Sequence, residues 1–81
     1  NETLKAYSVV AAGIGLGLAA LGGAIGMGNT AAATIAGTAR NPGLGGKLMT
    51  TMFIALAMIE AQVIYALVIA MIALYANPFL G

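Results

Sequence analysis

The stretch Arg40-Asn41-Pro42-Gly43-Leu44-Gly45-Gly46-Lys47 is polar, basic and rich in glycine, and it separates two long apolar runs. Residues 6–39 before it contain no charged side chain, and residues 48–81 after it contain one, Glu60. Each run exceeds the roughly 20 apolar residues that a helix needs to cross a bilayer. Pro42 disfavours a helical conformation at the residue before it, and the glycines favour a turn. The sequence therefore predicts a hairpin of two transmembrane helices.

We expect one all-α domain over residues 1–81, with a first helix at about 6–39, a loop at about 40–47 and a second helix at about 48–77. Of the 81 residues, 62% are hydrophobic, and only three Lys or Arg and two Glu are charged. A soluble domain carries about 25% charged residues. So few charges cannot cover a soluble surface.

The side-chain inventory excludes several classes of function. The chain has no cysteine and no histidine, which removes thiol chemistry, disulfides and the usual zinc sites, and we expect no metal centre and no cofactor. A net charge of +1 without a basic patch predicts no nucleic-acid partner. The run Gly15-Leu16-Gly17-Leu18-Ala19-Ala20 has the form of a dinucleotide fingerprint, but no strand precedes it and no acid follows at about 20 residues. It does not predict a nucleotide site.

Charges near the ends of the helices predict the orientation. Arg40 and Lys47 lie in the loop, whereas Lys5 is offset by Glu2 in the first segment. Cytoplasmic loops favour Lys and Arg, so we place the loop in the cytoplasm and both termini outside. Because the sequence starts at Asn1 rather than Met, we expect that residues preceded it, as a cleaved signal peptide or a shortened chain would explain.

Small residues occupy two opposite sides of the first helix, at about 100° per residue. One side carries Gly13, Gly17 and Gly28 with Ala20, Ala24 and Ala31; the other carries Gly15, Gly22, Gly23 and Gly26 with Ala19, Thr30 and Ala33. Small residues let helices approach closely in lipid, so each side can accept an identical neighbour. Head-to-tail contacts of this kind close into a homo-oligomeric ring. The alternative is that the glycines only pack the first helix against the second helix of the same chain.

Glu60 is the candidate functional residue, because an ionisable side chain within a spanning helix is costly and marks a functional site by default. The rest of its helix face is apolar and should meet lipid or a neighbouring subunit; it carries Phe53, Leu56, Ala57, Ile64, Leu67 and Met71. Desolvation disfavours a charged carboxylate, so we expect Glu60 to hold a proton or a metal cation at rest. The alternative is a protonated acid that only hydrogen-bonds between helices. Counted from the turn, Gly26-Met27-Gly28 should lie at the depth of Glu60.

Over nearly its whole length the sequence resembles the ring-forming c subunit of F-type ATP synthases. The motifs are Gly22-Gly23-Ala24-Ile25-Gly26-Met27-Gly28 for packing, Ala39-Arg40-Asn41-Pro42 in the loop (with Asn where the family has Gln), Ile59-Glu60-Ala61-Gln62-Val63-Ile64-Tyr65 for the ion site, and the ending Tyr75-Ala76-Asn77-Pro78-Phe79.

That resemblance implies a membrane subunit of an ATP synthase rather than an enzyme by itself, in a bacterial inner membrane, with an organellar membrane as the alternative. A ring of identical hairpins would turn against a stator a subunit, whose arginine would meet Glu60 as it passes. Each Glu60 would take an ion from one half-channel and release it into another. Arg40, Asn41 and Pro42 would dock the central stalk.

The resemblance favours a proton over sodium as the transported ion. Sodium-carrying members have a glutamine at the position of Met27 and a hydroxyl residue at that of Ala61, and both oxygens are absent here. Tyr65 matches a tyrosine that members place near the acid, although it could also be an aromatic residue of the membrane interface. Gln62 could hold a water near the site or hydrogen-bond between helices. Asn29 could be a packing residue or an outer partner of the site.

Two rival functions stay open: a sodium rotor with an altered set of ligands, and a passive structural or pore-forming hairpin. The loop around Arg40 favours docking over a pore, and a simple pore has little use for a lone acid on an apolar face.

Overall fold

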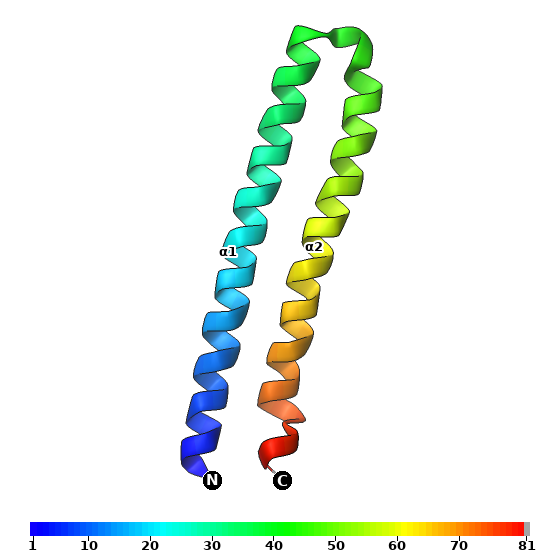
Figure 1. Cartoon of the computed structure of the whole chain (residues 1–81). Coiled ribbons are helices and arrows are strands. Elements are labelled where there is room, and N and C mark those ends of the chain that lie inside the picture. The colour runs from blue at the N-terminus through cyan, green and yellow to red at the C-terminus, as the bar shows by residue number, and fades with distance from the viewer. Residues whose placement is uncertain (81) are drawn as a thin grey trace.

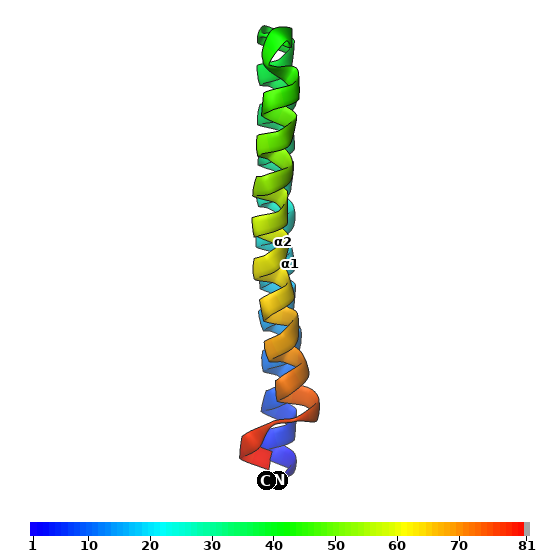
Figure 2. The same cartoon turned by 90° about the vertical axis from the view of Figure 1, so that its right-hand side faces the viewer.

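The structure, a computed structural model that describes residues 1–80, is an antiparallel hairpin of two long helices (Figure 1). Helix α1 spans Glu2–Arg40 and helix α2 spans Gly45–Tyr75; a 3₁₀ turn, η1, covers Pro42–Leu44 between them, and a second, η2, covers Pro78–Leu80. Figures 1 and 2 together show that α1 and α2 run side by side over their whole length, with both chain ends at the pole opposite the turn. The Cα trace measures 60 × 15 × 10 Å, so the fold is a single layer two helices wide.

The chain reverses within a few residues at the turn. Asn41 has φ −143° and ψ 80°, the extended conformation that a following proline favours. Its N–H donates to the carbonyl of Gly37 at 2.9 Å, and the N–H of Leu44 donates to the carbonyl of Asn41 at 3.0 Å. A Cβ on Gly45 would stand 3.2 Å from Cγ2 of Thr38, so the two helices already approach closely at the first residue of α2.

The helix ends differ by a few residues from the ranges expected from the sequence. Helix α1 begins at Glu2 rather than near residue 6, because the side-chain oxygen of Asn1 accepts from the amides of Thr3 and Leu4 at 2.9 and 3.2 Å and caps the helix. Helix α2 begins at Gly45 rather than near residue 48, and it ends at Tyr75 rather than near residue 77.

Hardly any side chain is buried within the hairpin. Among the described residues only Ala12, Ala70 and Ser8 fall below one tenth exposure, and no large side chain is fully buried. Both helices are long and apolar enough to cross a membrane, yet only 6% and 0% of their most apolar segments are buried. The core helix of a soluble protein would be mostly buried. The apolar surface is instead left for lipid and for other chains to cover.

A hydrogen-bonded pair, which we call the terminal clasp, joins α1 to the segment after α2. The side-chain amide of Asn77 donates to the hydroxyl of Ser8 at 2.9 Å, and that hydroxyl donates to the carbonyl of Leu4 at 2.8 Å. The Asn77 oxygen accepts from the N–H of Phe79 at 2.8 Å. Within residues 1–80, no other hydrogen bond between two side chains is formed.

Candidate functional site

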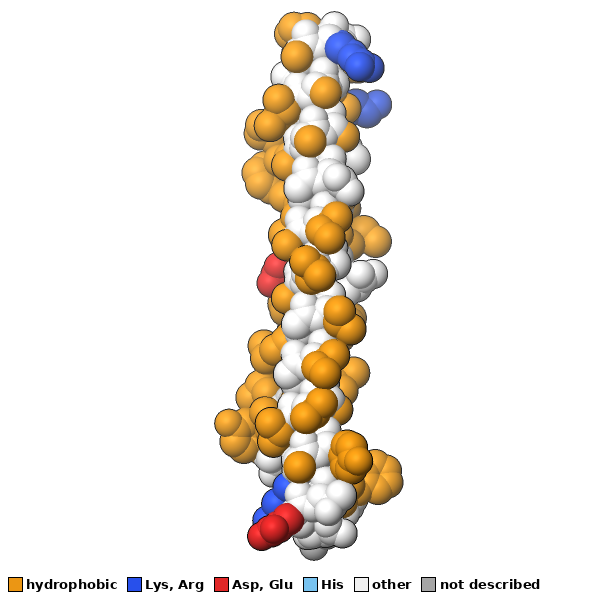
Figure 3. Space-filling view, turned by 90° about the vertical axis from the view of Figure 1, so that its left-hand side faces the viewer, with side chains coloured by type: hydrophobic (Ala, Val, Ile, Leu, Met, Phe, Trp, Pro, Cys, Tyr) orange, Lys and Arg blue, Asp and Glu red, His pale blue; other side chains and the backbone are white. Residues whose placement is uncertain are grey.

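Glu60 lies on a flank of the hairpin, about 100° around α2 from Ile59, which contacts α1. Its side chain is exposed. Large apolar residues of the same helix face are also exposed, with Phe53 at 59%, Ile64 at 48%, and Met71 at 50%. Figure 3 shows the apolar surface running along the hairpin, with acidic side chains at mid-height and at the terminal pole. Glu60 is the middle residue of α2, so its carboxyl lies at mid-height of the hairpin.

No cation of the same chain lies near this carboxyl. The nearest basic residue along α2 is Lys47, about 20 Å away along the axis at about 1.5 Å per residue. The described residues contain no group of three or more His, Cys, Asp or Glu that could hold a metal ion. Within one hairpin, Glu60 is therefore a lone acid on an apolar surface.

Contacts between the helices fix which part of α1 lies at this depth. A Cβ built on Gly26 would stand 3.4 Å from Cδ1 of Ile59, the residue before Glu60. A Cβ on Gly23 would stand 2.6 Å from Cγ2 of Val63 and 3.6 Å from Cγ2 of Ile59. Gly23 and Gly26 therefore face α2 within the same chain, at the level of Glu60.

The other residues proposed around the site are spread over several sides of the hairpin. Met27 and Ala61 are half-buried, whereas Gln62 and Tyr65 are exposed, Tyr65 to 67%. Gln62 helps to line a groove of about 360 Å³ between the helices, together with Leu18, Ala19, Gly22, Gly23, Gly26, Ile59 and Val63. In the described part of the chain, no side-chain hydrogen bond links Gln62 or Tyr65 to Glu60. A single hairpin does not bring these groups together into a closed site.

Of the six other glycines of α1, five have no close contact with α2, and Gly37 contacts Leu48 near the turn. Gly15 and Gly22 line grooves beside α2 without close contact to it. No heavy atom of the chain would lie within 4 Å of a Cβ at the open positions, which are Gly13, Gly15, Gly17, Gly22 and Gly28. Of the two small-residue sides expected from the sequence, one therefore contributes its middle glycines to packing within the hairpin, and the other is open.

The loop residues expected to dock a partner are at the tip of the rod. Arg40, Asn41 and Pro42 are all exposed. Basic side chains gather at the turn pole in Figure 3, where they are free to meet water or another protein. The exposed polar residues at the turn pole suit a contact with another protein beyond the end of the apolar helices.

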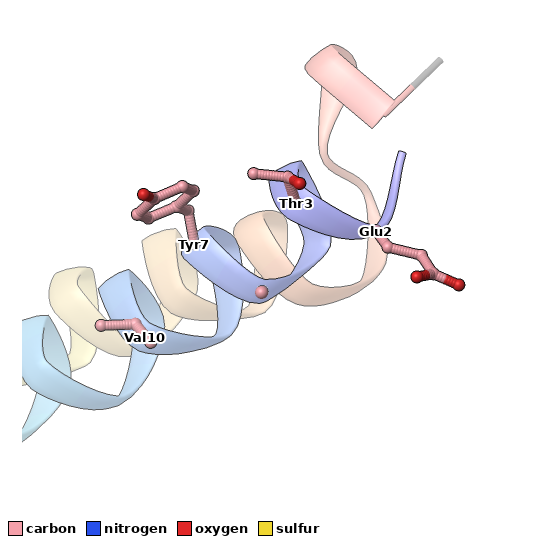
Figure 4. Close-up of a pocket in the computed structure, with 5 residues that line it drawn as sticks. Glu2, Thr3, Tyr7 and Val10 are labelled. Carbon is pink, nitrogen blue, oxygen red and sulfur yellow. The ribbon is translucent and has the colours of Figure 1, made fainter.

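A separate hollow of about 400 Å³ lies at the terminal pole, lined by Glu2, Thr3, Ala6, Tyr7 and Val10. All of these residues belong to α1. In Figure 4 the carboxyl of Glu2 points away from Tyr7 and Val10, so no polar groups converge on the hollow. It is a surface depression and not a second site for an ion.

Sequence reasoning missed two features of the structure. Ile59 and Val63 were named only as part of the ion-site motif and not as packing residues, although their spacing of four residues matches the side of α2 that meets Gly23 and Gly26. The terminal clasp was also missed, although Ser8 and Asn77 lie at nearly equal distances along the chain from Gly43. Pairing polar residues by their distance from the turn would have found it.

An apolar helical hairpin with one exposed carboxyl at mid-height defines a small membrane protein that works in contact with other chains rather than alone. Comparison with known proteins agrees: the chain belongs to the family of the ATP synthase C subunit, whose profile matches residues 10–73. That match includes the open glycines, the loop and Glu60. The clasp residues Ser8 and Asn77 lie outside it.

Relatives with the same family name match over the full length of this chain. It is 99% identical to the ATP synthase c subunit of Aliarcobacter butzleri (strain RM4018) over 81 residues, all of this chain and 78% of that relative. It is 90% identical to the c subunit of Sulfurimonas denitrificans (strain ATCC 33889 / DSM 1251) over 81 residues, again 78% of the relative. The protein of the same name from Campylobacter fetus subsp. fetus (strain 82-40) is 90% identical, with 81% of it covered.

Family membership establishes the coarse function. The chain is a membrane component of the F0 rotor of an ATP synthase, in a family that transports ions and whose helical hairpins form a ring. It is not catalytic by itself. The predicted all-α hairpin that assembles into a ring is thus confirmed.

Proposed function

We propose that the ring formed by this chain carries protons across a bacterial inner membrane, and that Glu60 of each copy is the group that is reversibly protonated. Both termini then face outside and the loop faces the cytoplasm. The passage of protons turns the ring and is coupled to ATP synthesis in the rest of the complex.

The observation that carries the proposal is the isolation of Glu60. It is the sole charged residue of α2 beyond Lys47, and it stands exposed among apolar side chains. A charged acid at the centre of a spanning helix costs about 2.5–3.5 kcal/mol or more. Binding a proton removes that cost while lipid covers the carboxyl.

The choice of the proton over sodium rests on the neighbouring residues. A sodium ion needs several oxygen ligands, whereas Met27 offers a thioether and Ala61 a methyl group. A thioether is a soft ligand and suits a hard cation poorly. A proton needs the carboxyl and one polar neighbour, a role that Tyr65 or Gln62 of the same or an adjacent copy can fill.

The cycle needs one more charge, supplied from outside the ring. A proton enters from one half-channel and neutralises the carboxylate, and the neutral acid turns through the lipid. A cation on a stator a subunit then favours the carboxylate, and the proton leaves into the other half-channel. Arg40, Asn41 and Pro42 would carry the central stalk, so that rotation of the ring reaches the catalytic part of the complex.

Reconstitution of the complete ATP synthase in vesicles tests the proposal. ATP-driven proton pumping should be independent of sodium concentration, and Glu60→Gln, which keeps the shape but cannot titrate, should abolish pumping while ring assembly persists. Glu60→Asp should keep part of the activity, because the acid survives on a shorter arm. Pumping of sodium in place of protons would establish the sodium rotor, and full pumping by Glu60→Gln would remove Glu60 from the mechanism.

A further inference from the structure

Two branched side chains of α2 pack against glycines of α1 at the depth of Glu60. A Cβ on Gly23 would stand 2.6 Å from Cγ2 of Val63, and a Cβ on Gly26 would stand 3.4 and 3.9 Å from Cδ1 and Cγ1 of Ile59. Optimal contact between carbon atoms lies at about 3.5–4.0 Å. Val63 therefore already occupies the space that any side chain larger than hydrogen would need at Gly23.

Neither side chain can move aside easily. Valine and isoleucine are stiff at χ1 in a helix, because two heavy atoms on Cβ leave one preferred rotamer. Val63 Cγ2 is bonded directly to Cβ, so it has no flexible arm to bend. An added methyl at Gly23 would thus have to push the helices apart or turn α2 about its axis.

The rotation of α2 at this depth decides where the acid points. Glu60 follows Ile59 by one residue, or about 100° around the helix. As long as Ile59 and Val63 face the glycines, Glu60 must lie on a flank of the hairpin, and its exposure agrees with this. Turning α2 about its axis would carry the carboxyl away from that flank.

Two of the glycine contacts between the helices lie near Glu60. Among the glycines of α1, all in the described range, only Gly23, Gly26 and Gly37 have a side chain of α2 within 4 Å of a built Cβ. The contact of Gly37 is to Leu48, close to the turn and far along the axis from Glu60. The contacts at Gly23 and Gly26 are those nearest to the acid.

We propose that Ile59 and Val63 are positioning residues for ion transport: seated against Gly23 and Gly26, they fix the rotation of α2 that places Glu60 on one flank of the hairpin. This inference rests on the proposed role of Glu60 as the carrier. It assigns Gly23 a task within each copy, distinct from contacts between copies.

The test uses Gly23→Ala in the complete ATP synthase, compared with the double variant Gly23→Ala, Val63→Ala. The readouts are the rate at which a hydrophobic carbodiimide modifies Glu60 as a function of pH, and proton pumping in vesicles. Gly46→Ala is the matched control, because its added methyl would meet no atom of the chain within 4 Å.

We expect Gly23→Ala to shift the pH profile of Glu60 modification and to lower pumping by on the order of tenfold or more, since small misplacements of a reacting group have effects of that size. Val63→Ala in the same chain should restore both readouts by making room for the new methyl. Gly46→Ala should leave both as in the wild type. A wild-type profile in Gly23→Ala, or no restoration by Val63→Ala, would overturn the positioning role.

If Gly23→Ala does not assemble into rings, the double variant alone tests the positioning role. Rings of the double variant with a wild-type profile support the proposal, and a double variant that does not assemble, or assembles with an altered profile, refutes it. Failure of the proposed function gives a different result: Glu60 of the wild-type ring would then be unreactive, or Glu60→Gln would still pump.

Discussion

At the level of single residues, the carboxyl of Glu60 combines two properties that rarely occur together. It is exposed from its own chain, and yet it lies half-way along an apolar rod, among side chains such as Phe53 and Ile64. Exposure allows another chain to approach it, while the apolar surroundings make its charged form costly. An acid in this setting can be reached by a charged group of another chain, as the proposed cycle requires.

A chemical prediction belongs to this scale. A hydrophobic carbodiimide, which requires a protonated carboxyl, should modify Glu60 selectively, and the rate should fall as pH rises because the carboxylate does not react. Glu2 is an internal control, since it is an exposed acid at the terminal pole, away from the apolar middle of the rod. Mass spectrometry of proteolytic fragments locates the modified residue.

Sodium provides a second prediction for the same residue. Millimolar sodium at neutral pH should not slow the modification, because neither Met27 nor Ala61 supplies a side-chain oxygen to a bound ion. The measurement is the modification rate with and without sodium at constant ionic strength. Clear protection by sodium would contradict the proton assignment while leaving Glu60 as the ion site.

The acid itself could be predicted from the sequence, because a lone charge within a bilayer-length apolar run is too costly to be retained without a function. The arrangement of the residues that surround Glu60 could not be predicted in the same way. Met27, Gln62 and Tyr65 sit on different sides of the hairpin, and which of them approaches a given carboxyl depends on the next copy in the ring. A single sequence contains no measure of that geometry.

At the level of the helices, apolar length predicted the existence of α1 and α2 but not their ends. The predicted first helix began only after the charged Lys5. In the structure, the side chain of Asn1 caps α1, and the helix begins at Glu2. Gly45 and Gly46 resembled turn residues, yet the reversal is already complete at Leu44. Helix ends follow from caps and turn geometry, which hydropathy does not report.

The terminal clasp gives a prediction at this scale. Ser8→Ala removes the acceptor of the Asn77 amide, so the ends of α1 and α2 should separate more easily, by about 1 kcal/mol. Backbone amides near the end of α2 should then exchange about fivefold faster with heavy water in detergent micelles. Thr50→Ala is the control, because the Thr50 hydroxyl donates only to the carbonyl of Gly46 in its own helix. Unchanged exchange in Ser8→Ala would show that the clasp adds no stability.

At the level of the whole molecule, the hairpin is a building block that is completed by its neighbours. Large apolar side chains are exposed along the full length, from Tyr7 at 71% to Tyr75 at 82%. The open glycine side of α1 offers flat backbone to another chain, and Glu60 lies on an exposed flank of α2. Under the proposed function, α1 makes contacts between copies and α2 carries the ion.

Ring assembly should depend on the open glycines. Gly28→Leu should block the ring by steric overlap between copies, because the new side chain meets no atom of its own chain near Cβ and cannot disturb the hairpin there. Gly26→Leu is a poorer test, since it would also collide with Ile59. Native mass spectrometry in mild detergent measures the number of copies, and Leu21→Ile should remain a ring. A complete ring of Gly28→Leu would place the copy-to-copy contact elsewhere.

The orientation of the hairpin can be tested with a single cysteine, because the chain has none. Gly46→Cys lies in open space at the turn pole, whereas Gly45 is close to Thr38. A membrane-impermeant thiol reagent should label Gly46→Cys only from the cytoplasmic side, and Thr3→Cys only from the outer side. The reverse pattern would invert the topology.

The scarcity of buried side chains also has a thermodynamic consequence. Ala12, Ala70 and Ser8 are the only described residues that the hairpin itself buries. Separating α1 from α2 inside a bilayer would therefore expose a little surface to lipid and almost none to water. The large heat capacity of unfolding in soluble domains comes from hydration of newly exposed apolar surface, and here that contribution is nearly absent. The cohesion of the two helices should change almost linearly with temperature, without the optimum or the cold denaturation of a water-soluble fold.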